Sequence, residues 1–412
     1  MISRAFLAKL SRHISIAKNR ASTADLPFGG VNVILCGDFH QFPPVATKTR
    51  APLYYESDVT KGDTVDDCLG RTIYEAFTTV VLLTQQVRVS DPVWMDLLHH
   101  LRRGRLQEHH LDTLRQLRLT DPRCPATDFT SSPWKDACLV TPRHAVRMHW
   151  NEAASRKHCE ESGVQLFICP SDDTIRGRPL SMVERYIAAS KKSRKGRRGG
   201  GNERAGLPDE VRIAKGMKVM VTLNVETDLD IANGTRGEIV DIILDPEEPP
   251  LQTSGYIVKL TKPPAYVLVK LDWTRLPPLN GLPPGVVPIE PAKKSFTIHV
   301  PSSSSSTPIK KTVSRRQLPI TPAYAFTDYR AQGQTITNVI VDIATPPSSE
   351  LTLFNIYVAL SRSSGRQTIR LLRDFDTSVF TRPLDERLRE EDERLQRLNE
   401  NTKVWWDQVN ST

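Results

Sequence analysis

The sequence predicts an α/β fold with a β-rich region in its second half. The first indication is the run Val31–Cys36, a short, β-branched and almost wholly apolar segment behind a Gly-Gly pair. This is the pattern of a strand buried on both faces. The second is that further elements follow it along the chain. They are a short apolar strand at Val80–Leu83; a helix that Asp91 caps and Pro92 begins, with Trp94, Leu97, Leu98 and Leu101 on one stripe; and a strand, turn and helix in DACLVTPRHAVRMHWNEAA. The third is residues 215–317, where apolar and polar residues alternate between Asn-Gly and Pro-rich turns, which indicates a small β-barrel.

Length and composition narrow the class of protein. The 412 residues suggest two or three domains, and the net charge of +9 favours a polyanionic partner. The six cysteines contain no CxxC pair, which argues against a disulfide framework and a structural zinc site and favours a reducing compartment. No apolar run approaches 18 residues, so no membrane-spanning helix is predicted.

Residues 1–22 contain no acidic residue and are rich in Arg, Lys, Ser and Ala. This composition fits a mitochondrial transit peptide. It also fits an amphipathic helix, because apolar residues recur at helical spacing, at Ile2, Phe6, Leu10, Ile14 and Ala17. The helix is the preferred interpretation, and the transit peptide stays open as the alternative.

Polar residues follow the predicted strand Val31–Cys36. Asp38 and Gln41 come directly after it, and Pro43 and Pro44 stiffen the backbone beyond them. The carboxyl ends of strands in open α/β sheets are where ligands bind. A ligand site is therefore one interpretation, and a buried strand that leads into a Pro-rich turn without any chemistry is the other.

The segment GDFHQFPPV resembles the GDxxQLPPV element of the Pif-type superfamily 1 DNA helicases, in which the glutamine senses the γ-phosphate of ATP. Four further elements resemble that family in the same order: LLTQQVR before a helix, DACLVTPRHAVRMHWNEAA with Asn151, GMKVMVTLN with IANGTRGEIV, and FTDYRAQGQT with YVALSR. Together they span Phe28 to about Phe375. The chain is identified on this basis as a member of that family.

The resemblance implies an α/β fold with an incomplete first RecA-like lobe and a second RecA-like lobe that carries an inserted small SH3-like β-barrel. The implied ranges are 1–125 for the remainder of the first lobe, 134–214 and 318–379 for the second lobe, 215–317 for the barrel, and 380–412 for a charged C-terminal helix.

The family's phosphate-binding loop (Walker A) and Asp-Glu magnesium motif (Walker B) are not found in these residues. Met1-Ile2-Ser3 resembles the start of the helix that follows the Asp-Glu pair, which would put both motifs upstream of Met1. The one candidate loop, Gly62 to Thr72, has seven residues between its glycines instead of four, and Arg71 stands where lysine is required. We expect a fragment, either truncated or with a mis-annotated start, that alone has no appreciable ATPase activity.

The resemblance also implies the site residues, with ATP and Mg as cofactors. The implied catalytic residues are Gln41, Arg88 and Arg362. The implied nucleotide-binding residues are Gly37, Asp38, Gln41, Gly333, Gln334 and Arg362. The implied nucleic-acid-binding residues are Thr327, Arg330, Gln332, Asn233, Lys191, Lys192 and Arg194. No metal ligand is expected. Tyr329 and Arg330 replace the family's usual His and Lys, so a positive charge is kept while the detail of strand engagement is in doubt.

Two peripheral segments are predicted from composition. Residues 191–198 hold six basic residues in eight and no hydrophobic one, which predicts a disordered basic loop over 191–204. That loop could contact phosphate, act as a nuclear localisation signal, or be a solvated loop. The Pro-rich segment 275–291 and the Ser run 302–306 are expected to be mobile loops.

The tail 380–412 is predicted as a charged helix with Leu384, Leu388, Leu395 and Leu398 roughly on one stripe. A solvated terminal helix is the preferred interpretation and a partner contact is the alternative. Trp405 and Trp406 are expected to pack against the body of the protein.

The function implied by the resemblance is ATP-driven 5′-to-3′ DNA unwinding, with roles in DNA repair, recombination or telomere maintenance. The implied partners are single-stranded DNA or duplex junctions, and no membrane. The nucleus is the expected location, with the mitochondrion as alternative. A noncatalytic single-stranded nucleic-acid-binding remnant of such a helicase is the second hypothesis.

Overall fold

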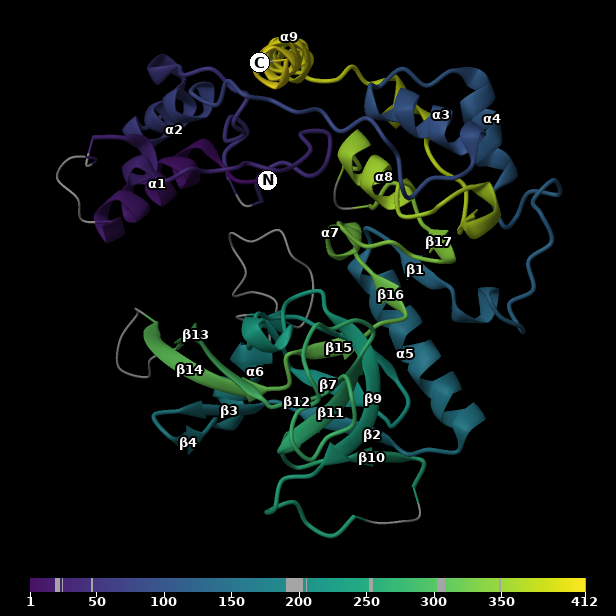
Figure 1. Cartoon of the computed structure of the whole chain (residues 1–412). Coiled ribbons are helices and arrows are strands. Elements are labelled where there is room, and N and C mark those ends of the chain that lie inside the picture. Colours follow the sequence, from purple (N-terminus) through teal and green to yellow (C-terminus); the bar gives the residue numbers. More distant parts are fainter. Residues whose placement is uncertain are drawn as a thin grey trace. The chain divides into compact units, whose positions relative to one another are not determined.

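The computed structural model describes residues 1–18, 23, 25–45, 47–189, 203–204, 206–251, 255–301, 308–347 and 350–411. The basic segment 191–198 and the Ser run 302–306 lie outside these residues. The chain forms two compact units, one of Met1–Asp136 with Ala331–Thr412 and one of Ala137–Arg330 (Figure 1). The mixed α/β fold is confirmed, whereas the five-part domain division stays a prediction. No described helix is both long and apolar enough to cross a membrane.

The first unit begins with two packed helices, α1 (Arg4–Lys18) and α2 (Val65–Glu75) (Figure 1). They approach so closely that a Cβ on Gly70 would lie 1.9 Å from the carbonyl oxygen of Arg4. The predicted N-terminal helix is confirmed, and Ile2, Leu10 and Ile14 of the predicted stripe pack partly buried against the core cluster that contains Leu7. Leu7 and Ala8 are buried beside that stripe, whereas Phe6 is 53% exposed.

Two predicted strands of the first unit are wrong. Residues 31–36 and 80–83 form no strand in the structure, and Ile34 and Leu83 are 88% and 94% exposed. A strand requires partners for its backbone N–H and C=O groups, and no sheet pairing with either segment occurs among the described residues.

Helices form the remainder of the first unit. α3 (Pro92–Arg102) packs on α8 (Leu353–Leu360) and is followed by α4 (Glu108–Gln116). The predicted start of α3 is confirmed, because the Asp91 carboxylate accepts hydrogen bonds from the backbone N–H groups of Val93 and Trp94 at 3.0 and 3.4 Å. β17 (Val339–Val341) and β18 (Ile369–Leu371) form a parallel pair.

The predicted tail helix is present as α9 (Glu386–Asn410), but it is packed and not simply solvated. Leu388, Glu391 and Asn399 are buried against the first unit. Tyr74 donates a hydrogen bond to Glu391, and burial raises the pKa of Tyr74. Two further side chains of α9 accept backbone hydrogen bonds. Oγ1 of Thr402 accepts the Val80 N–H at 3.0 Å, and Oδ1 of Asn399 accepts the Leu82 N–H at 2.9 Å.

The predicted packing of the two tryptophans is wrong too. Trp405 and Trp406 are 53% and 58% exposed near the end of α9.

The second unit opens with the predicted strand, turn and helix. β1 (Cys138–Val140) pairs in parallel with β16 (Ala325–Phe326), and α5 (His144–Ser162) follows. Asn151 on α5 is buried and binds the backbone of β16, with its Nδ2 donating to the Ala325 oxygen at 3.2 Å and its Oδ1 accepting the Ala325 N–H at 2.7 Å. One asparagine thus fixes the helix against a strand far away in the sequence.

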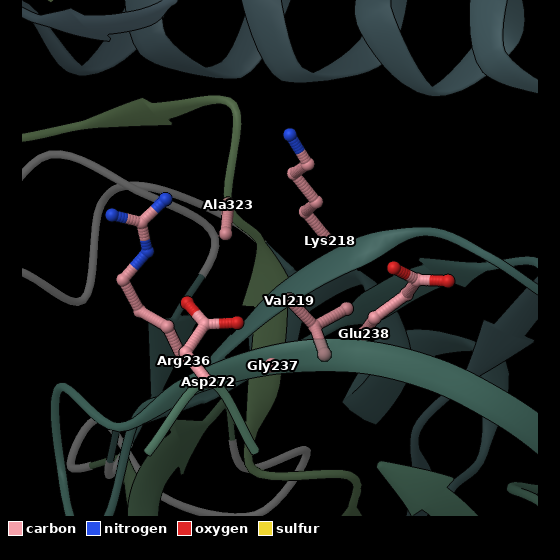
Figure 2. Close-up of a pocket in the computed structure, with 7 residues that line it drawn as sticks. All are labelled: Lys218, Val219, Arg236, Gly237, Glu238, Asp272 and Ala323. Atoms are coloured by element: carbon pink, nitrogen blue, oxygen red, sulfur yellow. The ribbon is translucent and has the colours of Figure 1, made fainter. Parts of the chain in front are cut away.

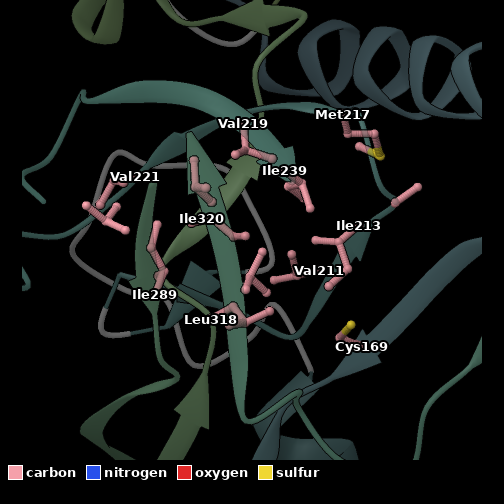
Figure 3. Packing of buried hydrophobic residues seen from close by; sticks show 14 of the residues in the cluster. Cys169, Val211, Ile213, Met217, Val219, Val221, Ile239, Ile289, Leu318 and Ile320 are labelled. Atoms are coloured by element: carbon pink, nitrogen blue, oxygen red, sulfur yellow. The ribbon is translucent and has the colours of Figure 1, made fainter. Parts of the chain in front are cut away.

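A five-stranded antiparallel sheet confirms the predicted alternating strands. Its order is β12 (Val286–Ile289), β11 (Tyr266–Leu271), β9 (Arg236–Ile243), β8 (Lys218–Val221) and β15 (Ile320–Pro322). Val219, Val221, Ile239 and Ile320 point into its core (Figure 3). β12 lies in the segment 275–291, so the prediction of a mobile loop is wrong for Val286–Ile289. Closure into an SH3-like barrel stays a prediction.

Shorter elements complete the second unit. Their bounds are β2 (Leu166–Pro170) between β7 (Glu210–Ile213) and β10 (Ile257–Lys259); a sheet in the order β13 (Ala292–Val300), β14 (Ile309–Gln317), β3 (Asp172–Ile175) and β4 (Arg178–Pro179); α6 (Met182–Ala189); the pair β5 (Glu203–Arg204) and β6 (Leu207–Pro208); and α7 (Asp328–Ala331), which ends at the boundary of the unit.

Candidate nucleotide-sensing site and nucleic-acid interface

Gln41 lies in a turn that Asp38 organises. The Asp38 carboxylate accepts hydrogen bonds from the His40 N–H at 3.0 Å and from Nε2 of Gln41 at 3.3 Å. Arg102, at the end of α3, donates to the same carboxylate at 3.0 Å. The Asp38 contact fixes the orientation of the Gln41 amide, with its oxygen turned away from Asp38.

The free oxygen of Gln41 meets the second motif region. Nε2 of Gln332 donates to Oε1 of Gln41 at 3.0 Å, across 291 residues of sequence. The structure thus brings together one residue predicted to sense the nucleotide and one predicted to contact nucleic acid. In this arrangement both ends of the Gln41 amide are occupied.

Arg88 approaches the same region from the segment before α3. Its Nε donates to Oγ1 of Thr335 at 2.9 Å and its Nη1 donates to the backbone oxygen of Ser361 at 3.1 Å. The segments that follow Arg88 and Ser361 run side by side, because the Ser90 N–H donates to the Ser364 backbone oxygen at 3.0 Å. Arg88 is therefore held between the Gln332–Thr335 turn and the end of α8.

Arg362 lies under that turn and is 2% exposed. Its Nε donates to the Val358 oxygen at 2.7 Å, and its Nη1 donates to the Ala331 and Gln334 oxygens at 3.3 and 3.0 Å. Its Nη2 donates to Oγ of Ser361 at 2.7 Å. The guanidinium therefore fixes the turn, in which Gly333 has φ +80°, and presents no open face.

Two cations thus share one region. Burial, together with the nearby charge of Arg88, lowers the pKa of Arg362 to about 10. Neither arginine has a carboxylate partner in the described part of the chain. Two uncompensated positive charges repel each other, and an anion bound beside them would remove that repulsion.

The predicted nucleic-acid residues are divided between the two units. Thr327 and Arg330 lie at the start of α7, where Oγ1 of Thr327 accepts the Arg330 N–H at 3.4 Å, and Tyr329 beside them is 50% exposed. Asn233 is exposed in a turn, where Oδ1 of Asn224 accepts the Asn233 N–H at 2.9 Å. Gln332 belongs to the first unit. Lys191, Lys192 and Arg194 lie outside the described residues.

Two supporting residues were not predicted. Arg102 anchors Asp38 and Thr335 anchors Arg88. Thr335 is the last residue of the quoted segment FTDYRAQGQT, and Arg102 ends the helix that follows the quoted segment LLTQQVR. Their roles depend on tertiary contacts, so the motifs alone could not assign them.

One group of possible metal ligands occurs among the described residues, Asp96, His100 and His110, whose ligand atoms lie within 4.8 Å of one another. Nδ1 of His110 accepts the Gln107 N–H at 3.1 Å. The ring of neutral His110 therefore carries its proton on Nε2 and donates it to Asp96 at 2.9 Å. His110 thus caps the start of α4 and orients the Asp96 carboxylate. Two histidines with one carboxylate also do not suit magnesium, which prefers oxygen ligands.

Comparisons with known proteins agree with the resemblance. A family model described as PIF1-like helicase matches residues 1–110. The ATP-dependent DNA helicase Pif1 of Bdellovibrio bacteriovorus is 25% identical over 88% of this chain and 63% of its own length. The ATP-dependent DNA helicase RRM3 of Saccharomyces cerevisiae is 23% identical over 91% of this chain and 50% of its own. The chain thus spans roughly half to two thirds of these relatives.

Solved structures share the fold. Bacteroides Pif1 bound to ssDNA superposes with a TM-score of 0.58 at 19% identity, over 95% of this chain and 72% of that one. Pif1 helicase from Candida albicans gives a TM-score of 0.54 at 21% identity, over 95% and 74%. The family model over residues 1–110, the relatives in sequence and the shared fold together support a Pif-type helicase.

Proposed function

We propose that this chain carries the γ-phosphate-sensing and strand-contacting portion of an ATP-dependent 5′-to-3′ DNA helicase. The observation that carries the proposal is the uncompensated pair Arg88 and Arg362 beside the Gln41–Gln332 contact. A site that reads a terminal phosphate needs positive charge and an oriented amide at one place. These residues supply both within one unit.

The residues fit a nucleotide unequally. Nη2 of Arg88 has no hydrogen-bond partner among the described residues and could bind a phosphate oxygen, whereas every nitrogen of Arg362 already donates within the turn. Arg88 and Gln41 would therefore contact the terminal phosphate, and Arg362 would act through the turn that it supports. Bound ATP would supply the phosphoryl group whose charge these donors stabilise.

Gln41 and Gln332 give the site a means to respond to its ligands. A Gln41 amide bonded to Asp38 and Gln332 cannot orient a water molecule at the same time. A bound phosphate that takes the Gln41 amide would therefore release Gln332. We propose that this exchange links the nucleotide to nucleic-acid contact.

We propose single-stranded DNA, or its junction with duplex, as the partner. Thr327, Arg330 and Asn233, with Lys191, Lys192 and Arg194, would contact the phosphate backbone independently of sequence. We further propose a role on nuclear DNA in repair or recombination.

The test is DNA-stimulated ATP hydrolysis, measured for this chain and for the chain joined to the phosphate-loop segment of a relative. We expect no appreciable turnover from the chain alone, because the printed residues contain no GxxxxGK[ST] loop. The joined protein should hydrolyse ATP, and Arg88→Ala should lower turnover about a thousandfold, the effect of losing an arginine finger.

Arg382→Ala is the matched control, since Arg382 is an exposed arginine of the same unit with only a 3.8 Å contact to Glu350. It should leave turnover unchanged. An Arg88→Ala protein with near-parental turnover would refute the assignment of the site. If the joined protein binds single-stranded DNA but never hydrolyses ATP, the noncatalytic remnant is the correct hypothesis.

A further inference from the structure

The five-stranded sheet of the second unit carries a cavity of about 190 Å³ that the proposed nucleotide site does not use. Buried Val219, Gly237 and Ala323 line it, together with the longer polar side chains Lys218, Arg236, Glu238 and Asp272 (Figure 2). Cavities for drug-sized ligands have about 300–1,000 Å³. This cavity therefore has room for a single flat ring system.

The cavity is kept open by backbone packing. A Cβ on Gly237 would lie 2.4 Å from the carbonyl oxygen of Lys270, so only glycine fits there. The Asp272 N–H donates to the Arg236 oxygen at 3.0 Å and the Ala323 N–H donates to the Lys218 oxygen at 2.9 Å. These bonds fix the backbone from which the polar side chains arise.

Arg236 and Asp272 line the same cavity without pairing. Arg236 lies over the Phe326 ring at 4.9 Å, and its Nη2 donates only to the thiol of Cys138 at 3.4 Å. Its Nε is buried without a hydrogen-bond partner. Among the described residues, neither side chain has an ion-pair partner within 4.0 Å. An unpaired guanidinium and an unpaired carboxylate at one cavity offer donors and acceptors to a third group.

An exposed aromatic residue follows the cavity residue Asp272 in the chain. Trp273, next to Asp272 in the chain, is 65% exposed, and the Arg275 guanidinium lies 5.4 Å from its ring centroid. The loop is held because Asp230 accepts hydrogen bonds from Thr274 Oγ1 at 3.0 Å and from the Arg275 N–H at 3.1 Å. Exposed aromatic side chains of this kind stack on the bases of single strands.

We propose that the cavity binds one base of single-stranded nucleic acid and prefers bases with an exocyclic amino group over thymine. The Asp272 carboxylate would accept from the amino group, and Arg236 would donate to a ring nitrogen or carbonyl. Thymine has no amino group, and its carbonyl oxygens are repelled by the carboxylate. Trp273 would stack on the neighbouring base. This inference rests on the proposed function, because the strand must already be held.

A backbone phosphate is the competing occupant. Lys218 and Arg236 would attract it, but the carboxylates of Glu238 and Asp272 line the same cavity and would repel it. A base edge satisfies both kinds of charge, whereas a phosphate satisfies only one. The composition of the cavity therefore favours the base.

The test is fluorescence anisotropy with labelled oligo-dC and oligo-dT at several salt concentrations, with the full chain. We expect tighter binding of dC, by about fivefold or more, the discrimination typical of a bidentate base contact. Asp272→Asn should remove or reverse this preference, because an amide can pair with thymine. Arg236→Lys should reduce it without changing the salt dependence, because the charge is kept and the two-pronged donor is lost. Trp273→Ala should weaken dC and dT equally.

Asp241→Asn is the control, since Asp241 is an exposed carboxylate on β9 with only a 3.8 Å contact to Lys215. It should keep the parental preference. If Asp272→Asn tightened both oligomers equally, the cavity would hold phosphate and the proposal would be wrong; equal affinity of the parental chain for dC and dT would also refute it. If the parental chain bound neither oligomer, strand binding itself, and thus that part of the proposed function, would fail.

Discussion

Arg362 is the residue whose structural role can be tested most directly, because that role predicts a loss of stability that does not depend on any chemical activity. Replacing it with alanine removes four hydrogen bonds to carbonyl or hydroxyl oxygens, one of which is longer, at 3.3 Å, and it leaves those oxygens under a closed turn. Hydrogen bonds from a charged donor contribute about 1.5–3 kcal/mol each, and neutral ones about 0.5–1.5 kcal/mol. Water that enters the space would bind some of the exposed oxygens and restore part of this free energy. We therefore expect Arg362→Ala to lower the free energy of unfolding by about 3–5 kcal/mol, as for breaking other buried charged contacts.

The assay is urea unfolding of the chain followed by tryptophan fluorescence, since Trp94 is fully buried in the first unit. With a slope of about 1–3 kcal/mol per molar urea, the transition of the first unit should shift by at least about 1 M in Arg362→Ala. Arg88→Ala is the comparison, because its side chain is half-buried and makes two hydrogen bonds; its shift should be well under half as large. Equal midpoints for Arg362→Ala and the parental chain would refute the structural role.

Three further predictions concern the first unit and the tail helix. The hydrogen bond from Arg4 holds the pKa of Asp63 well below its usual range. The pair therefore contributes stability above about pH 4, and this stability is lost as the pH falls through the lowered pKa. Asp63→Asn should flatten the acid limb of a curve of unfolding free energy against pH, and an unchanged limb would contradict this. Asn399→Ala leaves the Leu82 N–H without its acceptor and should cost about 1–3 kcal/mol in urea unfolding, whereas exposed Asn410→Ala should cost almost nothing. Gln332→Ala should free the Gln41 amide and weaken any nucleotide-dependent change in single-strand affinity; an unchanged dependence would exclude the exchange between these residues.

The sequence identified features whose causes are local. The Asp91 cap, the Pro92 start of α3 and the buried Trp94 stripe follow from residues within one or two helical turns of one another. The alternation in β8 and β9 is equally local, because successive side chains of a strand face opposite sides. The motif residues Gln41, Arg88 and Arg362 could also be named, since each stands in a short segment that resembles a family element.

The failures concern features that depend on distant partners. The run Val31–Cys36 has the composition of a buried strand, but a strand exists only where neighbouring strands take its backbone hydrogen bonds. The tail helix reads as a charged surface helix, yet Glu391 is buried because Tyr74 and Arg394 hold its carboxylate. No sequence periodicity reveals that a charged residue has a buried partner more than 300 positions away.

What the sequence by itself determined is the set of residues and their chemistry: a glutamine, two arginines and a glycine turn that match one family. The tertiary structure alone decided which of them contact. It joined Gln41 to Gln332, buried Arg362 under the turn, left a donor of Arg88 available, and placed Arg236 and Asp272 at one cavity without pairing them. The physical reason is that a hydrogen bond or an ion pair depends on distances of a few ångströms, which only the packing of distant segments sets.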